Sequence, residues 1–513
     1  MSTEPLAPAG GAPGETAAVA APPPPGTDAG GRPGRASLRP LVLRLHFYAG
    51  LLVAPFLLVA ALTGFLYACS LQAEKIVYRH ELSVPVGEGE LPVSRQVEAA
   101  REAHPEGTVS AVRPSPEAGA TTRVLLSGVP GVEEGRTLAV FVDPYTGEVR
   151  GALEQYGSSG ALPLRTWIDE FHRDLHLGEP GRLYSELAAS WLWVITGGGL
   201  VLWLGRRRTR SGTRSLLLPD RAATGRRRSR SLHGAVGTWA ALGLFFLSAT
   251  GLTWSAYAGA NIGELREAIG QSTPVVSIAL DGGHGDGHGG GHGDGADEHA
   301  GHKGAHGADR GTEAPGHSSG DVGMDAVLAA ARAQGLSDPV EIVPPAEPGT
   351  AYTVRQIQRS WPEKQDAVAV HPATGEVTDT VRFEDHPLLA KLTRWGIDAH
   401  MGTLFGVANQ AVLAALALAL VFLILWGYRM WWQRGRGRAF GRAIPRGAWR
   451  QAPPRLLLPL AAGAAAVGWF VPLLGIPLLA FLVLDTVLGA VLRRRNGRTG
   501  EPAAAGRSAG NGT

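Results

Sequence analysis

Four histidines of this chain lie at the ends of four apolar segments, where an ionisable side chain is costly to bury unless it has a role. His46 and His233 begin the segments LHFYAGLLVAPFLLVAALTG and LHGAVGTWAALGLFFLSATG. His172 in HRDLHLG and His400 in HMGTLFG lie just before two others. Imidazoles that approach from two neighbouring helices can bind one iron as the axial ligands of b-type haem. The sequence therefore predicts two histidine pairs that each hold one haem b.

Two internal repeats relate these histidines. The interval from His172 to His400 equals the interval between the motifs VDPYTGEV and VHPATGEV. The interval from His46 to His233 is shorter and equals that between the motifs LTG and ATG. A Gly/His-rich insertion near residues 281–320 has about the length that accounts for this difference. We interpret the chain as a tandem duplication, each copy with a helix, a soluble module and a second helix, an organisation that often builds a site between the copies.

Four apolar segments are long enough, or nearly so, to cross a bilayer, which takes about 20 helical residues. They are residues 41–68, 187–204, 233–257 and 403–426. A further stretch, 456–492, is interrupted by prolines and is expected to form a hairpin of two short helices, with one long tilted helix as the alternative. The predicted fold class is a mainly α membrane protein with a four-helix transmembrane core, a C-terminal helical hairpin and two small α+β modules.

The arginines indicate the orientation of these segments. Ten arginines lie between residues 206 and 230, and seven lie between residues 429 and 450. The positive-inside rule places both loops and both termini in the cytoplasm. We therefore expect a multi-pass protein in the lipid bilayer of the cytoplasmic membrane, with both soluble modules outside and no nucleic acid as partner. Cys69 is the only cysteine, which excludes an internal disulfide framework.

This orientation pairs the histidines by depth. His46 and His233 lie near the cytoplasmic face, whereas His172 and His400 lie near the outer face. Pairing across the faces would separate the two ligands of one iron by nearly a bilayer, about 30 Å. His176 is one helical turn from His172 and is an alternative ligand, although the repeat aligns His172 with His400. Glycines beside the histidines would admit either the macrocycle or a neighbouring helix.

The two soluble segments share one pattern of elements. The predicted elements are a helix at 94–104 and strands at 121–126 and 137–142 in the first copy, and a helix at 324–334 and strands at 352–356 and 367–370 in the second. In both copies the second strand runs into a turn rich in Pro, Gly and Asp or His.

A helix followed by an antiparallel meander with this turn resembles the PepSY domain. Together with the phrases HRDLHLGEPGR, KLTRWGIDAHMGTLFGVANQ and GYRMWWQR, the chain resembles the PepSY-associated transmembrane helix family over roughly residues 40–435. Members of that family are linked to iron uptake, and some are inner-membrane dihaem reductases of ferric siderophores. The resemblance implies a dihaem oxidoreductase whose acceptor is a ferric siderophore or another Fe(III) complex. It leaves the electron donor unidentified.

The Gly/His-rich insertion is a second candidate site. Imidazole and carboxylate groups on a flexible chain can bind Zn²⁺, Cu²⁺ or Ni²⁺ loosely. The candidate ligands are His284, His288, His292, His299, His302 and His306. No fixed spacing recurs among them, and a linker without a binding role is the alternative.

The chain is expected to divide as follows: tail 1–36, first span 37–70, module 71–160, second span 161–208, basic loop 209–230, third span 231–258, linker 259–322, module 323–385, fourth span 386–432, basic loop 433–454, one or two spans 455–492 and tail 493–513. No Walker A loop, dinucleotide fingerprint, HExxH motif or nucleophile elbow is present.

Transmembrane electron transfer through two haems is our leading hypothesis, and no catalytic residue is assigned. The alternatives are a haem-free protein that binds peptides or regulates a peptidase, and a metal-handling protein that acts through the insertion.

Overall fold

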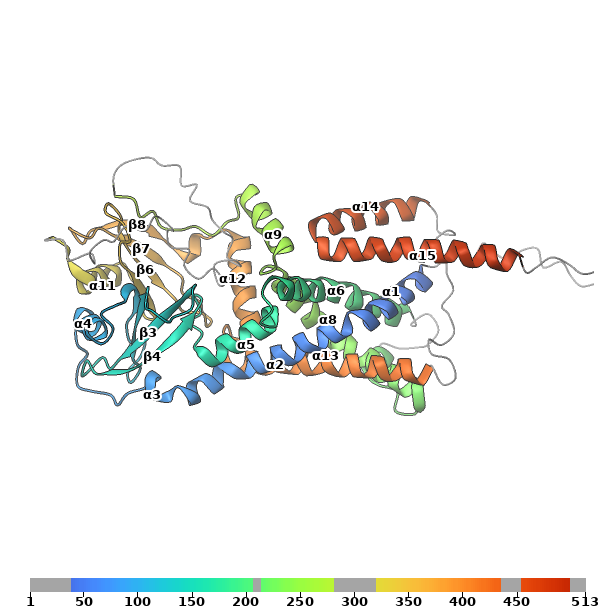
Figure 1. Ribbon diagram of the computed structural model, residues 1–513, viewed down its shortest axis with the longest axis horizontal. Helices are drawn as coiled ribbons and strands as arrows, with labels where there is room; N and C mark the ends of the chain where they lie inside the picture. Colours follow the sequence, from blue (N-terminus) through green and yellow to red (C-terminus); the bar gives the residue numbers. More distant parts are fainter. Residues whose placement is uncertain (1–37, 206–213, 281–319, 435–453, 499–513) are drawn as a thin grey trace, which may run out of the picture.

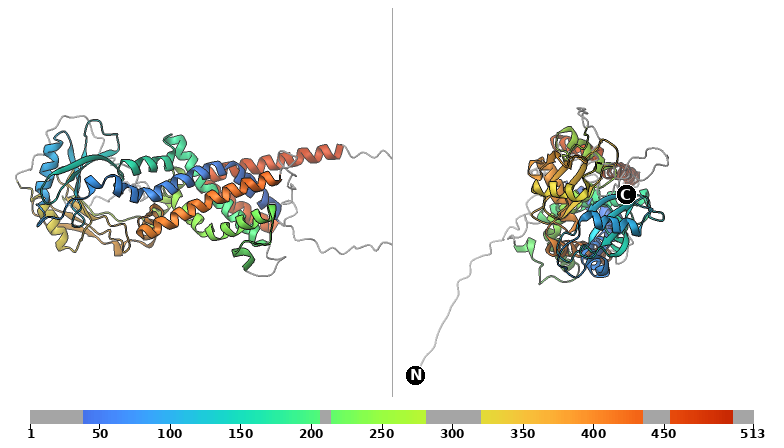
Figure 2. Two further views of the ribbon diagram at one scale, coloured as in Figure 1. Left: turned by 90° about the horizontal axis from the view of Figure 1, so that it is seen from below. Right: turned by 90° about the vertical axis from the view of Figure 1, so that its left-hand side faces the viewer.

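The computed structural model describes residues 38–205, 214–280, 320–434 and 454–498. The molecule is elongated, with a β-sheet at one end and a bundle of long helices that run along its long axis (Figures 1 and 2). The histidine-rich insertion and parts of the arginine-rich loops, 206–213 and 435–453, lie outside the described residues.

Within the described ranges, five helices are long and apolar enough to cross a membrane. They belong to α2 (Ala54–Val77), α6 (Glu179–Leu204), α8 (Gly225–Leu252), α13 (Gly406–Arg434) and α15 (Pro472–Arg498). The chain is therefore a multi-pass membrane protein. Helix α6 packs against α8 and α1 (Arg39–Leu52), and α2 packs along α13.

The first apolar segment is two helices, because a break at Val53 separates α1 from α2. Pro55 has no backbone N–H and leaves the carbonyl of Leu51 without its helical donor. The hydroxyl of Tyr428 on α13 donates to that carbonyl at 3.1 Å. A neighbouring helix thus satisfies the group that the proline exposes, as the bilayer interior requires. Helix α2 also continues to Val77, beyond the predicted end of the span at residue 70.

Residues 454–498 form two helices, α14 (Pro454–Phe470) and α15, which pack against each other. A Cβ atom on Gly475 would lie 2.5 Å from the Cα of Gly468, so the turn between them needs glycine at this crossing. The hairpin docks on the bundle through a buried ion pair between Arg44 on α1 and Asp485 on α15. The indole of Trp191 on α6 also donates to the carbonyl of Leu473 at 3.2 Å.

The two soluble segments share a single antiparallel sheet of eight strands in the order β4-β3-β2-β1-β5-β6-β7-β8. The strands are β1 (Thr108–Arg113), β2 (Thr122–Ser127), β3 (Arg136–Val142), β4 (Val149–Tyr156), β5 (Val340–Val343), β6 (Tyr352–Gln356), β7 (Ala367–Val370) and β8 (Val377–Val381). The sequence predicts β2, β3, β6 and β7. It does not predict the edge strands β4 and β8 or the central strands β1 and β5. Val112 of β1 pairs with Ile342 of β5, and this contact joins the two halves.

Alternating residues give this sheet two buried faces. Helices α4 (Val93–Ala103) and α11 (Gly323–Ala333) cover the face of the sheet that carries the side chains of Val112 and Val124. The opposite face buries Phe141. Across the central strands, Nε of Arg113 lies 2.6 Å from a carboxylate oxygen of the buried Glu341.

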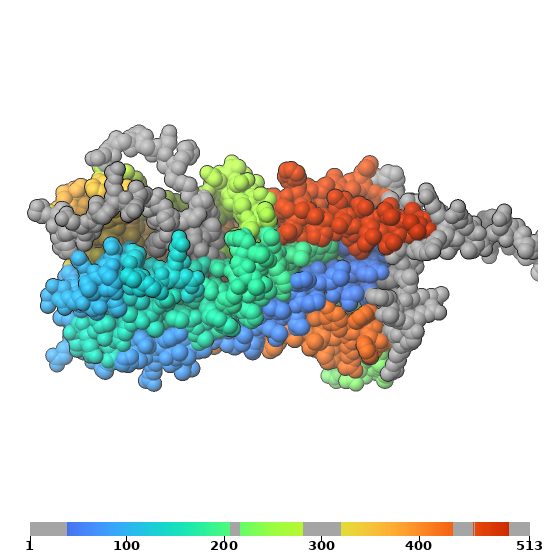
Figure 3. Space-filling view, viewed as in Figure 1, coloured from blue at the N-terminus to red at the C-terminus, as the bar shows by residue number. Residues whose placement is uncertain are grey.

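Shorter helices connect the sheet to the bundle. They are α3 (Arg79–Leu82), α5 (Pro163–Asp174), α9 (Tyr257–Ala268), the 3-10 turn η2 (Phe383–Asp385) and α12 (Leu388–Met401). The short helix α7 (Arg214–Leu217) instead follows α6 in the chain and packs against α8. Helix α9 stands beside the C-terminal hairpin on one face of the molecule (Figure 3), and Asn261 donates to the carbonyl of Phe470 at 2.8 Å. Helices α5 and α12 carry His172 and His400.

Candidate functional site

His46 on α1 and His233 on α8 face each other inside the bundle. Their ring centroids are 6.4 Å apart and the ring planes are inclined by 77°. Metal–nitrogen bonds are about 2.0 Å long, so at this separation the two imidazoles could hold one metal ion between them.

The tautomer of His46 is fixed by the backbone. Its Nδ1 lies 2.8 Å from the carbonyl oxygen of Ile195 on α6. A carbonyl only accepts, so Nδ1 carries the proton and Nε2 keeps a lone pair for a metal. A Cβ atom on Gly199 would lie 2.9 Å from Cε1 of His46, so glycine on α6 allows the two helices to approach at this ring.

His172 on α5 is held by a threonine on α2. Its Nδ1 lies 2.8 Å from Oγ1 of Thr63, which donates its own proton to the carbonyl of Val59 at 2.9 Å. When the hydroxyl donates to the carbonyl, its oxygen accepts the Nδ1–H of His172. In that tautomer Nε2 of His172 is unprotonated, the state in which a histidine binds a metal.

The same arrangement occurs at His400 on α12. Its Nδ1 lies 2.6 Å from Oγ1 of Thr250 on α8, and Thr250 donates to the carbonyl of Phe246 at 2.8 Å. Glycines follow both threonines. A Cβ atom on Gly64 would lie 3.2 Å from Cε1 of His172, and one on Gly251 would lie 3.7 Å from Cε1 of His400.

His172 and His400 line one cavity of about 220 Å³ between α2, α5, α6, α8, α12 and α13. Most of its wall is apolar, with side chains that include Leu57, Ala61, Leu244, Leu413 and Leu420. The indole of Trp254 packs edge-on against the ring of His400, with the centroids 5.3 Å apart. The structure thus brings His172 and His400 to one mostly apolar cavity.

Buried acids fix the helices that carry these histidines. Glu74 at the end of α2 accepts from the backbone N–H of Leu162 at 2.6 Å and pairs with Arg165 of α5 at 2.8 Å. Asp398 on α12 pairs with Arg394 at 3.0 Å and with Arg359 at 3.2 Å. These contacts set the positions of α5 and α12, and therefore the depth of their histidines.

Glu186 is a buried carboxylate on α6 that the sequence does not single out. Its two oxygens accept from the backbone N–H groups of Tyr257 and Ala258, each at 3.0 Å. These donors belong to the first turn of α9, where N–H groups lack helical partners. Glu186 therefore acts as the N-terminal cap of α9 from a different helix.

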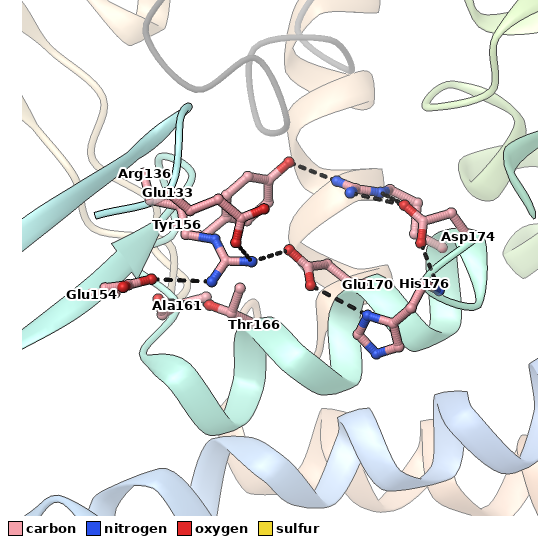
Figure 4. Close-up of polar contacts among 10 residues, drawn as sticks. Glu133, Arg136, Glu154, Tyr156, Ala161, Thr166, Glu170, Asp174 and His176 are labelled. Atoms are coloured by element: carbon pink, nitrogen blue, oxygen red, sulfur yellow. Dashed lines mark hydrogen bonds and ion pairs between the residues drawn. The ribbon is translucent and has the colours of Figure 1, made fainter. Parts of the chain in front are cut away.

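His176 lies apart from the cavity that His172 lines. Leu175 and His176 adopt positive φ angles of 58° and 54°, which end α5 and turn the His176 ring back along it. The ring stacks on Phe171 with the centroids 5.8 Å apart, and Nδ1 lies 3.4 Å from Glu170 (Figure 4). His176 is thus part of a polar network at the sheet border.

The residues that sequence reasoning missed are the partners of the histidines. Thr63 and Thr250 precede glycines in the repeated motifs LTG and ATG, and that recurrence is the signal that could have identified them. Gly199 lies in the triplet GGG of α6. The six histidines proposed as loose metal ligands lie outside the described residues. In the part of the chain that the structure describes, no group of three or more His, Cys, Asp or Glu residues could hold a metal ion.

Comparison with known proteins agrees with the sequence motifs. The family model described as PepSY-associated TM region matches residues 43–434, which is well over half of the chain. No curated protein matches the chain significantly. The resemblance inferred from the motifs is confirmed, and the chain belongs to the PepSY-associated TM region family.

Proposed function

We propose that this protein is a dihaem membrane protein that transfers electrons across the cytoplasmic membrane and reduces Fe(III) complexes, such as ferric siderophores, at the outer face. The observation that carries this proposal is the repeated threonine–histidine contact. Thr63 contacts Nδ1 of His172, Thr250 contacts Nδ1 of His400, and both imidazoles line one largely apolar cavity. A threonine oxygen that accepts Nδ1–H leaves Nε2 free for a metal.

A tandem duplication is part of the proposal. Thr63 and Thr250 are separated along the chain by the same interval as His46 and His233, so the two threonines occupy equivalent positions of the repeat. Each threonine–histidine pair joins a long helix to a short helix at the sheet end of the bundle. The positive-inside rule puts the arginine-rich end in the cytoplasm and the sheet outside.

The residues of both sites fit haem b as ligand. His46 and His233 would hold one haem near the cytoplasmic end, and His172 and His400 the other near the sheet. The outer cavity of about 220 Å³ is smaller than the 300–1,000 Å³ usual for ligand sites. Its apolar side chains would have to move apart as the macrocycle enters. When bound, the two haems supply one-electron redox couples at different depths of the membrane.

The protein's own contribution is ligation, orientation and exclusion of water. Thr63, Thr250 and the carbonyl of Ile195 keep the Nδ1 protons in place, so that the imidazoles do not rotate. The apolar wall lowers the local dielectric and influences the redox potential of the bound group. One electron delivered to a chelated Fe(III) gives Fe(II), which hard oxygen donors hold less tightly.

The test is an absorbance spectrum of the detergent-purified protein before and after dithionite, with the ratio of haem to protein. We expect a Soret band, a sharp reduced α-band and about two haems per chain. His400→Ala and His46→Ala should each lose about one haem, whereas His80→Ala, at an exposed position of α3, should lose none.

Absence of a Soret band after haem supplementation during expression would refute the proposal. A colourless protein with the same fold would favour the haem-free peptide-binding alternative. Loss of function on deletion of 281–320, with the haem retained, would favour metal handling by that segment.

A further inference from the structure

A cluster of arginines lies at the end of the bundle away from the sheet, where α1 and α8 begin (Figure 1). Arg226, Arg227, Arg228 and Arg230 occupy the first two turns of α8, and all four are exposed. The first turn of α8 contains no acidic residue. Positive charge is unfavourable there, because the N-terminal end of a helix is the positive end of its dipole. These arginines therefore weaken the start of α8 unless an anion joins them.

Two of these arginines share a helix face with His233. Residues three, four or seven positions apart lie on the same side of an α-helix. Arg230 precedes His233 by three residues, and Arg226 precedes it by seven. On α1, Arg39 precedes His46 by seven residues. The entrance arginines, as we call Arg39, Arg226 and Arg230, therefore occupy the two helix faces that carry the inner histidines.

The entrance arginines also come together across the two helices. The positive charges of Arg39 and Arg226 both reach the guanidinium of Arg230 and repel it. At a rise of 1.5 Å per residue, Arg230 is about 4.5 Å along the helix axis from its histidine, and the other two are about 10.5 Å from theirs. The guanidinium groups are thus gathered one to two helical turns beyond the histidine pair.

The protein supplies little negative charge to this cluster. Asp220 is the acid closest to it in the chain, and its carboxylate pairs with Arg227 at 3.5 Å. Among the residues that the structure describes, Arg226 and Arg230 have no carboxylate partner. The positive-inside rule accounts for arginines anywhere in a cytoplasmic loop. It does not account for arginines on the helix faces of both inner histidines, which indicate an anionic ligand.

We propose that the entrance arginines bind the two propionate carboxylates of the haem at His46 and His233. The inference rests on the proposed function, because it names the residues that hold the acidic edge of that inner haem. Guanidinium groups bind carboxylates through two parallel hydrogen bonds. The carboxylates then stay at the polar end of the bundle, and the apolar edge of the macrocycle is left to the bundle interior.

The test compares haem with haem dimethyl ester, in which both propionates are esterified and uncharged. Full-length His400→Ala protein is produced in haem-deficient cells, purified in detergent and titrated with either compound, so that only the inner site contributes to the absorbance change. A hydrogen bond to a charged group contributes about tenfold or more in affinity. We therefore expect the ester to bind about tenfold or more weakly than haem.

Substitutions of one arginine then assign this preference to the cluster. Arg230→Gln should bind haem about tenfold more weakly than the parent protein and should bind the ester unchanged. Arg230→Lys keeps the charge without the planar fork and should lie between them. Arg228→Gln is the matched control and should behave as the parent. Arg228 is an exposed arginine of the same helix, but it precedes His233 by five residues and lies on another face.

Two results would overturn the assignment. One is equal affinity of the parent protein for haem and for the ester, and the other is an equal effect of Arg230→Gln and Arg228→Gln on haem affinity. Either would leave the arginines to the phosphates of anionic lipids. A protein that binds haem at the inner site without preferring it to the ester refutes this inference alone. A protein that binds neither compound refutes the proposed function as well.

Discussion

Under the proposed function, replacement of Thr250 by valine should loosen the haem proposed at His172 and His400 while preserving the fold. Valine has nearly the shape of threonine but cannot accept the Nδ1–H of His400, which lies 2.6 Å from the hydroxyl oxygen. The imidazole would lose the contact that fixes its tautomer and its rotation about χ2. The change therefore isolates the hydrogen bond from the packing around it.

The expected magnitude follows from what such partners contribute elsewhere. Loss of a hydrogen-bond partner of a metal-binding histidine weakens metal binding or activity about 10- to 100-fold, which corresponds to about 1.4–2.8 kcal/mol. An unpaired buried donor costs about 1–3 kcal/mol, so two independent estimates agree. We expect the outer haem to dissociate from Thr250→Val about 10 to 100 times faster than from the wild type.

The assay is haem transfer to excess apomyoglobin, followed by absorbance. It is performed in a His46→Ala background, so that only the outer haem contributes. Thr250→Ser keeps the hydroxyl and should retain haem nearly as well as the wild type. Thr238→Val is the matched control, because Thr238 lies on the same helix and donates to the carbonyl of Gly234 at 2.8 Å.

Equal haem loss from Thr250→Val and Thr238→Val would refute this reasoning. The hydroxyl of Thr250 would then be an ordinary satisfied side chain of a membrane helix. The repeated threonine–histidine contact would no longer support metal binding.

Two further predictions concern stability. Asp485→Ala should destabilise the protein by about 3–5 kcal/mol, because it leaves Arg44 as a buried charge without its acid. The double variant with Arg44→Met should recover most of that loss in thermal unfolding followed by circular dichroism, and no recovery would mean that the pair does not act as a unit. Burial, together with the nearby Asp398, raises the pKa of Glu363 to about 8 despite the neighbouring Arg394. The pKa of Glu363 is about 4.3 in the unfolded chain and higher in the folded protein. The protonated carboxyl therefore contributes stability that is fully present below about pH 4.3 and is lost as the pH rises through about 8. Thermal unfolding from pH 5 to pH 9 should show this decline in the wild type and not in Glu363→Gln, and identical profiles would show that Glu363 does not titrate there.

Local patterns were sufficient for much of the architecture. The runs Tyr352–Gln356 and Ala367–Val370 are strands at the predicted residues. The first alternates buried and partly buried side chains, and the second is a short apolar run, and both patterns are properties of the chain itself. The helices Val93–Ala103 and Gly323–Ala333 begin one residue before their predicted starts. Prolines in 456–492 likewise indicated two helices rather than one.

The sheet shows where local patterns stop being informative. Val340–Val343 is a very short strand, and its pairing with β1 depends on two segments that lie in different halves of the chain. Strand β8 has no fully buried residue, so its hydrophobic pattern is weak. Such strands are defined by their partners, since β-propensity mainly reflects packing against neighbours.

By itself, the sequence determined which residue types recur and at what spacing. It indicated the four histidines, the apolar spans and the family to which the chain belongs. The tertiary structure decided what each histidine contacts: Thr63 and Thr250 lie on other helices, and Glu186 caps a helix far along the chain. Hydrogen bonds of this kind depend on how helices cross in space, and a linear pattern carries no information about that crossing until the chain is folded.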